Sequence, residues 1–423
     1  MLQLNFIRDN KEEVIERLSV KNFDANESVE KILALDITRR KTQAELDSLN
    51  AEANVLAKQT GELFKLGKKT EADDLKNKSL ALKESVKKTE ASLSIVEEEL
   101  STILILLPNL PNVNVPKGKT PADNEVVFSA GEAPKLPPNA KPHWELTQKY
   151  DIIDFELGVK LTGAGFPVYK GKGAKLQRSL INFFLDKATS AGYLEIEAPL
   201  LVNEASGFGT GQLPDKEGQM YHVTVDNLYL IPTAEVPITN MYREVILKAE
   251  QLPVKNCGYT PCFRREAGSY GKDVRGLNRL HQFDKVEIVQ IVHPEKSYNV
   301  LEEMKTFVAG ILEQLELPYR ILKLCGGDMS FASALTYDFE TYSAAQQKWL
   351  EVSSVSNFET FQSNRSKIRF REGSGKPQLA HTLNGSALAL PRIVATLLEN
   401  NQTENGIRIP KALVPYTGYE IID

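Results

Sequence analysis

Mostly apolar side chains recur along residues 27–104 at spacings that alternate between three and four. This heptad spacing is typical of helices that wrap around one another in a coiled coil. Gly67, in the segment FKLGKKT, divides the pattern and is positioned to end a helix. The pattern predicts an antiparallel helical hairpin, roughly 50 Å long at 1.5 Å per residue, which Pro108 ends. The seam positions are Ile32, Leu35, Arg39, Thr42, Leu46, Leu49, Ala53, Leu56, Thr60 and Leu63, then Ala72, Leu75, Ser79, Leu82, Val86, Thr89, Leu93, Val96, Leu100 and Ile103.

The pattern changes at residues 108–142, which carry eight prolines with interspersed Gly and Asn. This composition predicts a linker with no regular element beyond a short strand at Val126–Phe128. From residue 143 to residue 423, apolar β-runs alternate with helical segments. The chain is therefore expected to be α+β, with a helical arm at 1–107, a linker at 108–142 and a larger domain at 143–423.

Residues 176–203 combine a helical pattern with a strand pattern. Apolar residues from Leu176 to Ala188 have helical spacing, and Gly192 suits the end of that helix. Tyr193–Ala198 reads as a strand, and Pro199 then stops ladder hydrogen bonding on one side. The segment predicts a core helix followed by an edge strand.

Residues 263–287 read FRREAGSYGKDVRGLNRLHQFDKVE and predict two antiparallel strands joined by a loop. Period-2 geometry can bring five of their side chains onto one face: Arg264, Glu266, Arg279, Phe283 and Glu287. Guanidiniums suit phosphate, an aromatic ring suits a planar base, and a carboxylate suits an ammonium group. A charged hairpin is usually a solvated sheet face, but five residues at fixed offsets favour a site for a nucleotide beside an amino acid.

Composition limits the class of protein. A chain of 423 residues suggests two domains, and 42% apolar with 25% charged residues is ordinary for a globular protein. No apolar run approaches the roughly 20 residues that a membrane helix needs, and the start lacks a secretory signal pattern, so a cytoplasmic protein is expected. Cys257, Cys262 and Cys325 have no CxxC spacing, so we expect reduced buried thiols, with zinc only a minor alternative.

Charge is distributed unevenly along the predicted hairpin. Residues 58–88 hold nine lysines against five acids, although the whole chain has a net charge of −5. A positive distal half suits phosphate contact with a helical RNA, whereas a dimerisation rod or scaffold is the commoner use of a coiled coil. The candidate RNA-binding residues are Lys65, Lys68, Lys69 and Lys76.

Several motifs resemble those of one enzyme family. FRxE, a loop, RxxxF and a Glu four residues later resemble motif 2 of the class II aminoacyl-tRNA synthetases. TAEVP at 233–237, TPCFRREAGSYG at 260–271 and HQFDKVE at 281–287 are similar to the bacterial-type seryl-tRNA synthetases, and the resemblance covers essentially the whole chain. The helix, strand and proline of 176–203 resemble motif 1, which in the family forms the homodimer interface. HTLNGSALALPRIVATLLEN at 381–400 resembles motif 3.

The resemblance implies a class II antiparallel sheet flanked by helices, a coiled-coil arm and a serine–tRNA ligase reaction. Serine attacks the α-phosphorus of ATP to give seryl-adenylate, and the 3′ end of tRNA(Ser) takes the serine; tRNA(Sec) is a further candidate substrate. Arg264, Glu266 and Arg392 are the expected catalytic residues: Arg264 on the α-phosphate, Glu266 on the adenine amino group and Arg392 on the γ-phosphate. Glu351 is expected to hold Mg²⁺.

The implied substrate sites can be given residue by residue. The serine site comprises Thr233, Ala234, Glu235, Arg264, Glu287 and Ser386. The ATP site comprises Arg264, Arg265, Glu266, Phe283, Glu351, Val352, Ser353, Ser354 and Arg392. Residues 210–214 and 268–277 are expected to order over the substrates. Leu390 and Pro391 stand where many relatives have a small residue and glycine, so a local backbone change is expected there.

Two alternatives remain at this point. A related ligase could charge a carrier protein, although such relatives lack the long helical arm. A catalytically inactive paralogue could serve as an RNA-binding scaffold, although the motif residues named above are intact.

Overall fold

The computed structural model describes residues 1–215, 218–266 and 275–423, and it divides into two compact units. The first unit comprises Met1–Ser19 and Phe23–Pro108. The second comprises Val20–Asn22 and Asn109–Asp423. In the part of the chain described, no helix is long and apolar enough to cross a membrane.

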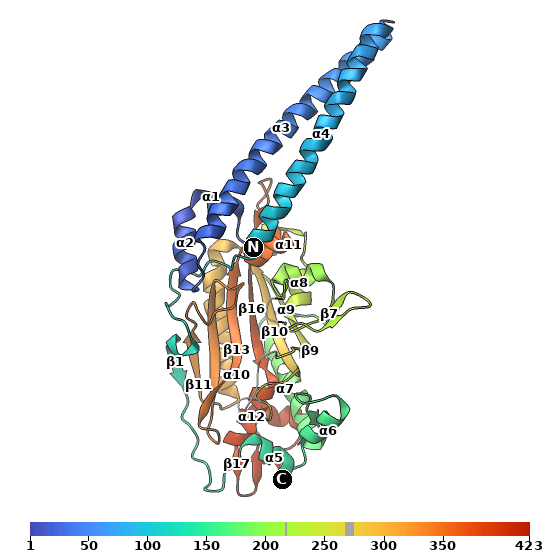
Figure 1. The fold of residues 1–423 in the computed structure, drawn as a ribbon. Coiled ribbons are helices and arrows are strands. Elements are labelled where there is room, and N and C mark those ends of the chain that lie inside the picture. Colours follow the sequence, from blue (N-terminus) through green and yellow to red (C-terminus); the bar gives the residue numbers. More distant parts are fainter. Residues whose placement is uncertain (216–217, 267–274) are drawn as a thin grey trace. The chain divides into compact units, whose positions relative to one another are not determined.

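The first unit is dominated by two long helices, α3 (Asn26–Lys65) and α4 (Lys69–Leu104), which run side by side in Figure 1. Two short helices, α1 (Leu4–Asp9) and α2 (Lys11–Val20), precede them. All twenty predicted seam positions are buried or half-buried. Gly67 lies between the two long helices with a φ of 74°, a left-handed conformation that costs glycine little. The predicted coiled-coil hairpin is confirmed.

The base of the hairpin contains a buried acid, Asp36, which the heptad pattern did not predict. Its carboxylate forms ion pairs with Arg8 at 3.3 Å, Arg39 at 3.0 Å and Arg40 at 3.1 Å. Burial raises the pKa of Asp36, but the hydrogen bonds from Arg39 and Arg8 outweigh it and hold the pKa below its usual value. The cluster links α1 to α3 and explains why an arginine occupies a seam position.

The second unit is built on an eight-stranded sheet with strand order β1-β11-β12-β13-β16-β10-β9-β4. Neighbouring strands are antiparallel except for β4 and β9, which are parallel. The predicted class II antiparallel sheet is confirmed. The strands are β1 (Glu125–Ala130), β4 (Leu194–Glu195), β9 (Val254–Phe263), β10 (Gln282–Val292), β11 (Tyr319–Lys323), β12 (Leu335–Ser343), β13 (Lys348–Glu359) and β16 (His381–Ala389).

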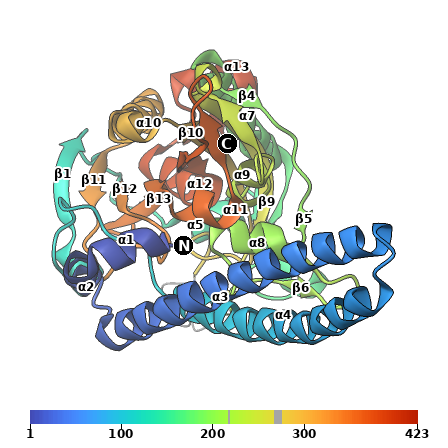
Figure 2. The same ribbon diagram turned by 90° about the horizontal axis from the view of Figure 1, so that it is seen from above.

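Helices α7 (Gly171–Ser190), α10 (Ser297–Gln314) and α12 (Leu390–Asn400) pack against this sheet, as Figures 1 and 2 show. Phe183 of α7 and Ile311 of α10 join the main core together with Val286 and Ile288 of β10. Side chains alternate across a strand. Glu287 and Val289 of β10 therefore point to the opposite face of the sheet, where Val289 packs against Ile238.

Smaller elements complete the second unit. They are α5 (His143–Lys149), β2 (Ile153–Asp154), α6 (Phe155–Leu161), β3 (Val168–Tyr169), β5 (Leu201–Val202), α8 (Glu204–Thr210), β6 (His222–Val223), β7 (Leu228–Leu230), α9 (Glu235–Asn240), β8 (Ile246–Lys248), α11 (Phe361–Ser366), β14 (Arg369–Arg371), β15 (Gln378–Leu379), β17 (Gln402–Thr403), β18 (Gly406–Arg408), α13 (Val414–Thr417) and β19 (Ile421–Ile422).

Two predicted segments differ in length from the observed ones. The strand predicted at Val126–Phe128 is present as β1, which pairs with β11 at one edge of the main sheet. The strand predicted at Tyr193–Ala198 is shorter, because only Leu194–Glu195 forms β4 at the other edge.

Candidate functional site

The candidate site begins where β9 ends and β10 starts. Arg264 follows the last residue of β9, and its guanidinium carbon lies 5.2 Å from the centre of the Phe283 ring. Its Nε donates to the carbonyl of Pro232 at 3.4 Å. A guanidinium held over an aromatic ring presents a planar cation beside a planar apolar surface. This arrangement suits a phosphorylated base.

Glu266 and Arg279 form an ion pair of 3.0 Å at the same end of the strands. The prediction that strand geometry aligns five side chains was wrong in part. Arg264, Glu266 and Arg279 lie outside β9 and β10, and only Phe283 and Glu287 belong to a strand. Glu266 has a left-handed φ of 47°, so the chain has left the strand conformation there.

The next residue after Arg264 lies in a different environment. Arg265 is exposed, and its guanidinium lies 5.8 Å from the ring of Tyr221, away from the Arg264–Phe283 pair. Residues 268–274 of the predicted 268–277 loop lie outside the described residues.

A buried group of ionisable side chains lies farther along the same face. Glu287 is 2% exposed and accepts from the Thr233 hydroxyl at 3.1 Å. Lys285 is also buried, and its Nζ lies 2.5 Å from the same carboxylate. Ser386 stands directly opposite Glu287 in the β10–β16 ladder. Ala234 is fully buried beside this group, at the start of α9.

Glu235 is the second buried acid in this group. Burial, together with the negative charge of Glu287, raises the pKa of Glu235 to about 7. Gln362 donates to its carboxylate at 2.6 Å and accepts in turn from the Thr382 hydroxyl at 2.7 Å. Two acids with a single lysine favour an ammonium group as the ligand of this pocket.

Lys285 and Gln362 were not predicted as site residues. Lys285 lies between Phe283 and Glu287 at the same period-2 spacing, so the strand pattern contained a signal for it. Gln362 lies in α11, outside every motif in the sequence, and only the fold brings it to Glu235.

Arg392, at the start of α12, is fixed between two backbone carbonyls. Its Nε donates to the carbonyl of Asn278 at 3.0 Å, and its Nη1 donates to that of Glu351 at 2.8 Å. The Glu351 carboxylate lies 3.6 Å from Nη1. The structure thus brings Arg392 and Glu351 together. The expected backbone irregularity falls at Leu388, which has a φ of 89°, and Leu390 and Pro391 instead begin a regular helix.

The four residues Glu351–Ser354 have different environments. Glu351 is exposed and Val352 is buried in the main core. The Ser353 hydroxyl donates to the carbonyl of Ser386 at 2.7 Å, and that of Ser354 donates to Asp338 at 2.6 Å. Burial, with the charge of Glu351 adding to it, raises the pKa of Asp338 well above its usual value.

Residues 210–214 were expected to order over the substrates, but they are already packed. Thr210 and Leu213 are buried. Gln362 donates to the carbonyl of Thr210 at 3.1 Å, and Arg365 donates to that of Leu213 at 3.0 Å. These bonds hold the segment against α11.

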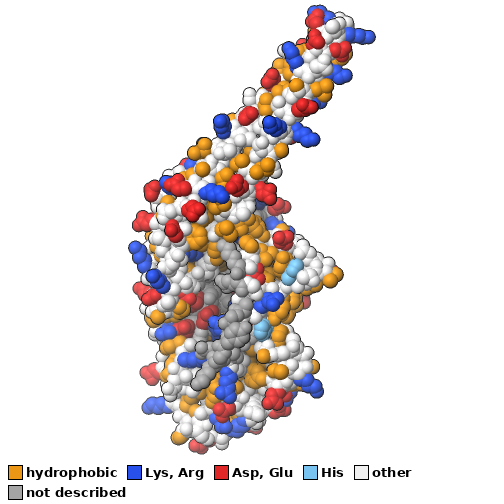
Figure 3. Space-filling view, in the orientation of Figure 1, with side chains coloured by type: hydrophobic (Ala, Val, Ile, Leu, Met, Phe, Trp, Pro, Cys, Tyr) orange, Lys and Arg blue, Asp and Glu red, His pale blue; other side chains and the backbone are white. Residues whose placement is uncertain are grey.

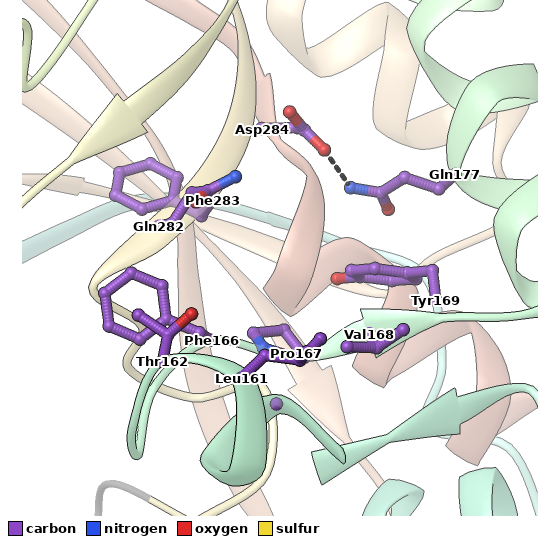
Figure 4. Close-up of a pocket in the computed structure, with 11 residues that line it drawn as sticks. Leu161, Thr162, Phe166, Pro167, Val168, Tyr169, Gln177, Gln282, Phe283 and Asp284 are labelled. Carbon is purple, nitrogen blue, oxygen red and sulfur yellow. Dashed lines mark hydrogen bonds between the residues drawn. The ribbon is translucent and has the colours of Figure 1, made fainter.

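Two further features bear on ligands. Among the described residues, no three His, Cys, Asp or Glu side chains cluster as a metal-ligand set, and all three cysteines are buried thiols. A hollow of about 200 Å³ lies beside Phe283. Figure 4 shows residues that line it, among them Gln177, which donates to Asp284 at 2.8 Å. The Tyr169 hydroxyl and the Gln177 carbonyl oxygen have no hydrogen-bond partner in the part of the chain described.

The predicted RNA-binding lysines lie around the turn of the α3–α4 hairpin. Lys65, Lys68, Lys69 and Lys76 are all exposed, and Lys68 pairs with Glu71 at 3.0 Å. Figure 3 shows basic side chains interspersed with acidic ones along this distal half.

Comparison with known proteins identifies both units. Residues 1–111 match the family model described as "Seryl-tRNA synthetase N-terminal domain", and residues 221–401 match "tRNA synthetase class II core domain (G, H, P, S and T)". A serine–tRNA ligase from Salinibacter ruber is 50% identical, with 99% of this chain and 98% of the relative covered. One from Chlorobium luteolum is 47% identical, with 100% and 99% covered.

Solved structures agree with these matches. Seryl-tRNA synthetase from Pyrococcus horikoshii, crystallised with ATP, is 33% identical with a TM-score of 0.92, and 100% of this chain and 99% of that chain are covered. Cytoplasmic serine–tRNA ligase from Naegleria fowleri, crystallised with AMP, is 26% identical with a TM-score of 0.87 and the same coverage. This chain belongs to the seryl-tRNA synthetase family of class II aminoacyl-tRNA synthetases.

Proposed function

We propose that this chain activates L-serine with ATP and transfers it to the 3′ end of tRNA(Ser). The observation that carries the proposal is the shared face of β9, β10 and β16. There the Arg264–Phe283 pair lies on the same side of the sheet as the buried Glu287, Thr233 and Lys285 group. A nucleotide site therefore adjoins an ammonium site. Crystals of family members with ATP and with AMP support the nucleotide assignment.

The proposed reaction needs positioning and positive charge rather than a protein nucleophile. Arg264 binds the α-phosphate and stabilises the charge that develops there when the serine carboxylate attacks. Phe283 stacks on adenine, and Glu266 accepts from the adenine amino group after exchanging its bond with Arg279. Arg265 joins the ATP site once its guanidinium leaves the ring of Tyr221. Val352, Ser353 and Ser354 line the site through their backbone, because their side chains are buried or already hydrogen-bonded. Arg392 reaches the γ-phosphate, which leaves with pyrophosphate.

The proposed serine site uses the buried carboxylates. Glu287 takes the ammonium group, and Thr233 and Ser386 hydrogen-bond the serine hydroxyl. Ala234 and Glu235 form the wall behind them. A ligand without the hydroxyl would strand buried polar groups, so alanine is rejected by roughly 10⁴-fold.

Mg²⁺ fits the phosphate end of the site. Mg²⁺ is usually held by one or two carboxylates together with substrate phosphates. Glu351 is an exposed carboxylate next to Arg392. Its negative charge adds to burial in raising the pKa of the nearby Asp338. We propose that Glu351 holds the ion, which neutralises phosphate charge when bound.

Two partners complete the proposal. The hairpin of α3 and α4 binds the long variable arm of tRNA(Ser) through Lys65, Lys68, Lys69 and Lys76, and tRNA(Sec) remains a further candidate. The protein acts as a homodimer through the α7–β4 segment. We place the activity in the cytoplasm, where its substrates are.

Serine-dependent exchange of pyrophosphate into ATP, measured beside charging of tRNA, tests the function. The proposal requires both activities. A carrier-protein ligase would exchange without charging tRNA, and an inactive paralogue would do neither.

The first site prediction concerns Arg264. Replacing Arg264 with Ala should lower kcat/KM for exchange by about 10²–10³-fold, the usual loss on removing one charge-stabilising donor. Arg371→Ala, an exposed arginine on β14, is the matched control and should leave exchange unchanged. Equal activity of the two variants would remove Arg264 from the proposed site.

A further inference from the structure

Helix α12 carries two ionisable residues on one face, Arg392 and Glu399. Arg392 is the third residue of the helix, and Glu399 follows seven residues later, which is about two helical turns. Glu399 is completely buried, and its carboxylate accepts from the ring Nδ1 of His143 at 2.6 Å and from the backbone N–H of His143 at 2.8 Å. The Ser343 hydroxyl donates to the other carboxylate oxygen. A buried acid with this many donors is fixed in place.

The other nitrogen of the His143 ring holds the chain that returns to β10. The backbone N–H of Leu277 donates to His143 Nε2 at 2.9 Å. Nε2 is therefore the acceptor, and Nδ1 carries the proton given to Glu399. The neighbouring Arg275 guanidinium lies 4.8 Å from the ring of Trp144, so α5 holds this backbone at two points.

Gly276 gives independent support for a close approach. It has a φ of 65°, and a Cβ atom placed on it would lie 2.2 Å from His143 Nε2. Any side chain would therefore push the backbone away from the imidazole.

A second branch joins Glu399 to Asn278. Gln346 donates to the Glu399 carboxylate at 2.8 Å, and its carbonyl oxygen accepts from the Asn278 side chain at 3.2 Å. The backbone carbonyl of the same Asn278 accepts from Arg392 at 3.0 Å. Both ends of α12 thus hold the segment 275–279, one end through His143 and Gln346 and the other through Arg392.

We propose that His143 is a positioning residue that, seated on Glu399, fixes the backbone of residues 275–279 and so aligns Arg392 for ATP. The inference deepens the proposed function and rests on it for the role of Arg392. His143 touches no substrate. It acts through the Leu277 amide and the Asn278 carbonyl.

Two substitutions separate the two ring nitrogens. The side chain of Gln can present an acceptor near the position of Nε2, whereas that of Asn reaches only near Nδ1. His143→Asn should therefore lose the Leu277 bond and keep the Glu399 bond, and His143→Gln should do the reverse. The bond to Glu399 is the shorter one, 2.6 Å against 2.9 Å, and its loss leaves a buried acid with fewer donors. His143→Gln should therefore have the lower Tm.

The variant with the higher Tm, His143→Asn, is expected to have the higher KM for ATP. His143→Asn should raise the KM for ATP in pyrophosphate exchange about tenfold, the effect of one lost hydrogen bond. His143→Gln should stay within about twofold, and neither variant should change the KM for serine. A KM for ATP that instead follows Tm, or a rise of both KM values together, would overturn the inference and leave His143 a purely structural residue.

Two further measurements protect the test. Gly276→Ala keeps the His143–Glu399 pair and displaces the same backbone, so it should reproduce the selective rise in KM for ATP even if the His143 variants fold poorly.

Hydrogen exchange of the Leu277 amide tests the same bond without an activity assay. Protection should be lost in His143→Asn and kept in His143→Gln, and equal protection would refute the anchor. If the wild-type protein shows no serine-dependent exchange, the proposed function is wrong. The role of His143 in holding the Leu277 amide would still be tested by the protection of that amide.

Discussion

At the residue scale, the pocket behind the Arg264–Phe283 pair combines charges that are costly to bury. Glu287 is compensated by Lys285 at 2.5 Å and by the Thr233 hydroxyl. The Glu235 carboxyl accepts from the neutral amide of Gln362, and burial favours the form of Glu235 that keeps its proton. An incoming ammonium group can supply the positive charge that allows Glu235 to release this proton.

Glu235 gives a prediction for the dependence of stability on pH. Burial, together with the negative charge of Glu287, raises the pKa of Glu235 from the ordinary 4.5 to about 7. Between these values the folded chain holds a proton that the unfolded chain releases, so this group's contribution to the free energy of unfolding falls as pH rises. The loss is roughly 3 kcal/mol over that window. Glu235→Gln should lack it, so the variant should gain stability relative to wild type between pH 5 and pH 8 in denaturant unfolding. A difference in stability that does not vary with pH would contradict the assigned pKa.

At the element scale, local periodicity predicted helices well because it depends only on nearby residues. The twenty seam positions and the break at Gly67 follow from spacing alone. Strand spacing was less informative at residues 263–266, because the chain leaves the strand after Phe263 and Glu266 turns to a left-handed conformation.

The remaining features depend on residues distant in sequence. Gln362 reaches Glu235 only because α11 and α9 meet in the fold. One extra residue of β16 between the partners of Lys285 and Glu287 makes a bulge, which accommodates the positive φ of Leu388. No spacing in the sequence encodes such pairings.

The α3–α4 hairpin gives a prediction of its own. Changing both Lys68 and Lys69 to Glu removes two positive charges near the turn and adds two negative ones. The KM for tRNA should rise at least tenfold, because each phosphate contact contributes electrostatic free energy that depends on salt. Pyrophosphate exchange should not change. Lys135→Glu with Lys376→Glu makes the same change of charge at exposed positions of the other unit and is the control. An unchanged KM for tRNA would remove the hairpin from the binding account.

At the scale of the whole molecule, the two compact units divide the proposed work. The residues of the proposed adenylation site all lie within Asn109–Asp423, and the proposed RNA-binding lysines all lie within the first unit. Changes to the first unit should therefore lower charging and leave exchange intact, whereas changes to the proposed adenylation site should lower both. One edge of the sheet in the second unit is β4, which among the described residues pairs with β9 and with no other strand. An unpaired edge that follows the long helix α7 is a surface on which a second chain can add.

Assembly of two chains through this edge is the last prediction. Leu194 in β4 is 63% exposed, so in a single chain this apolar side chain would face water at the open edge. A lysine at the same place would bring like charges together across a twofold axis, where each residue meets its own copy or a close neighbour. In sedimentation velocity the wild-type protein should behave as two chains of 47.2 kDa, and Leu194→Lys should shift it toward one. Val225→Lys makes the same apolar-to-lysine change at a position that is 92% exposed in the turn between β6 and β7, and it should not alter the mass. A wild-type protein that sediments as a single chain at micromolar concentration would defeat the proposed homodimer, and dissociation by both variants would move the interface away from β4.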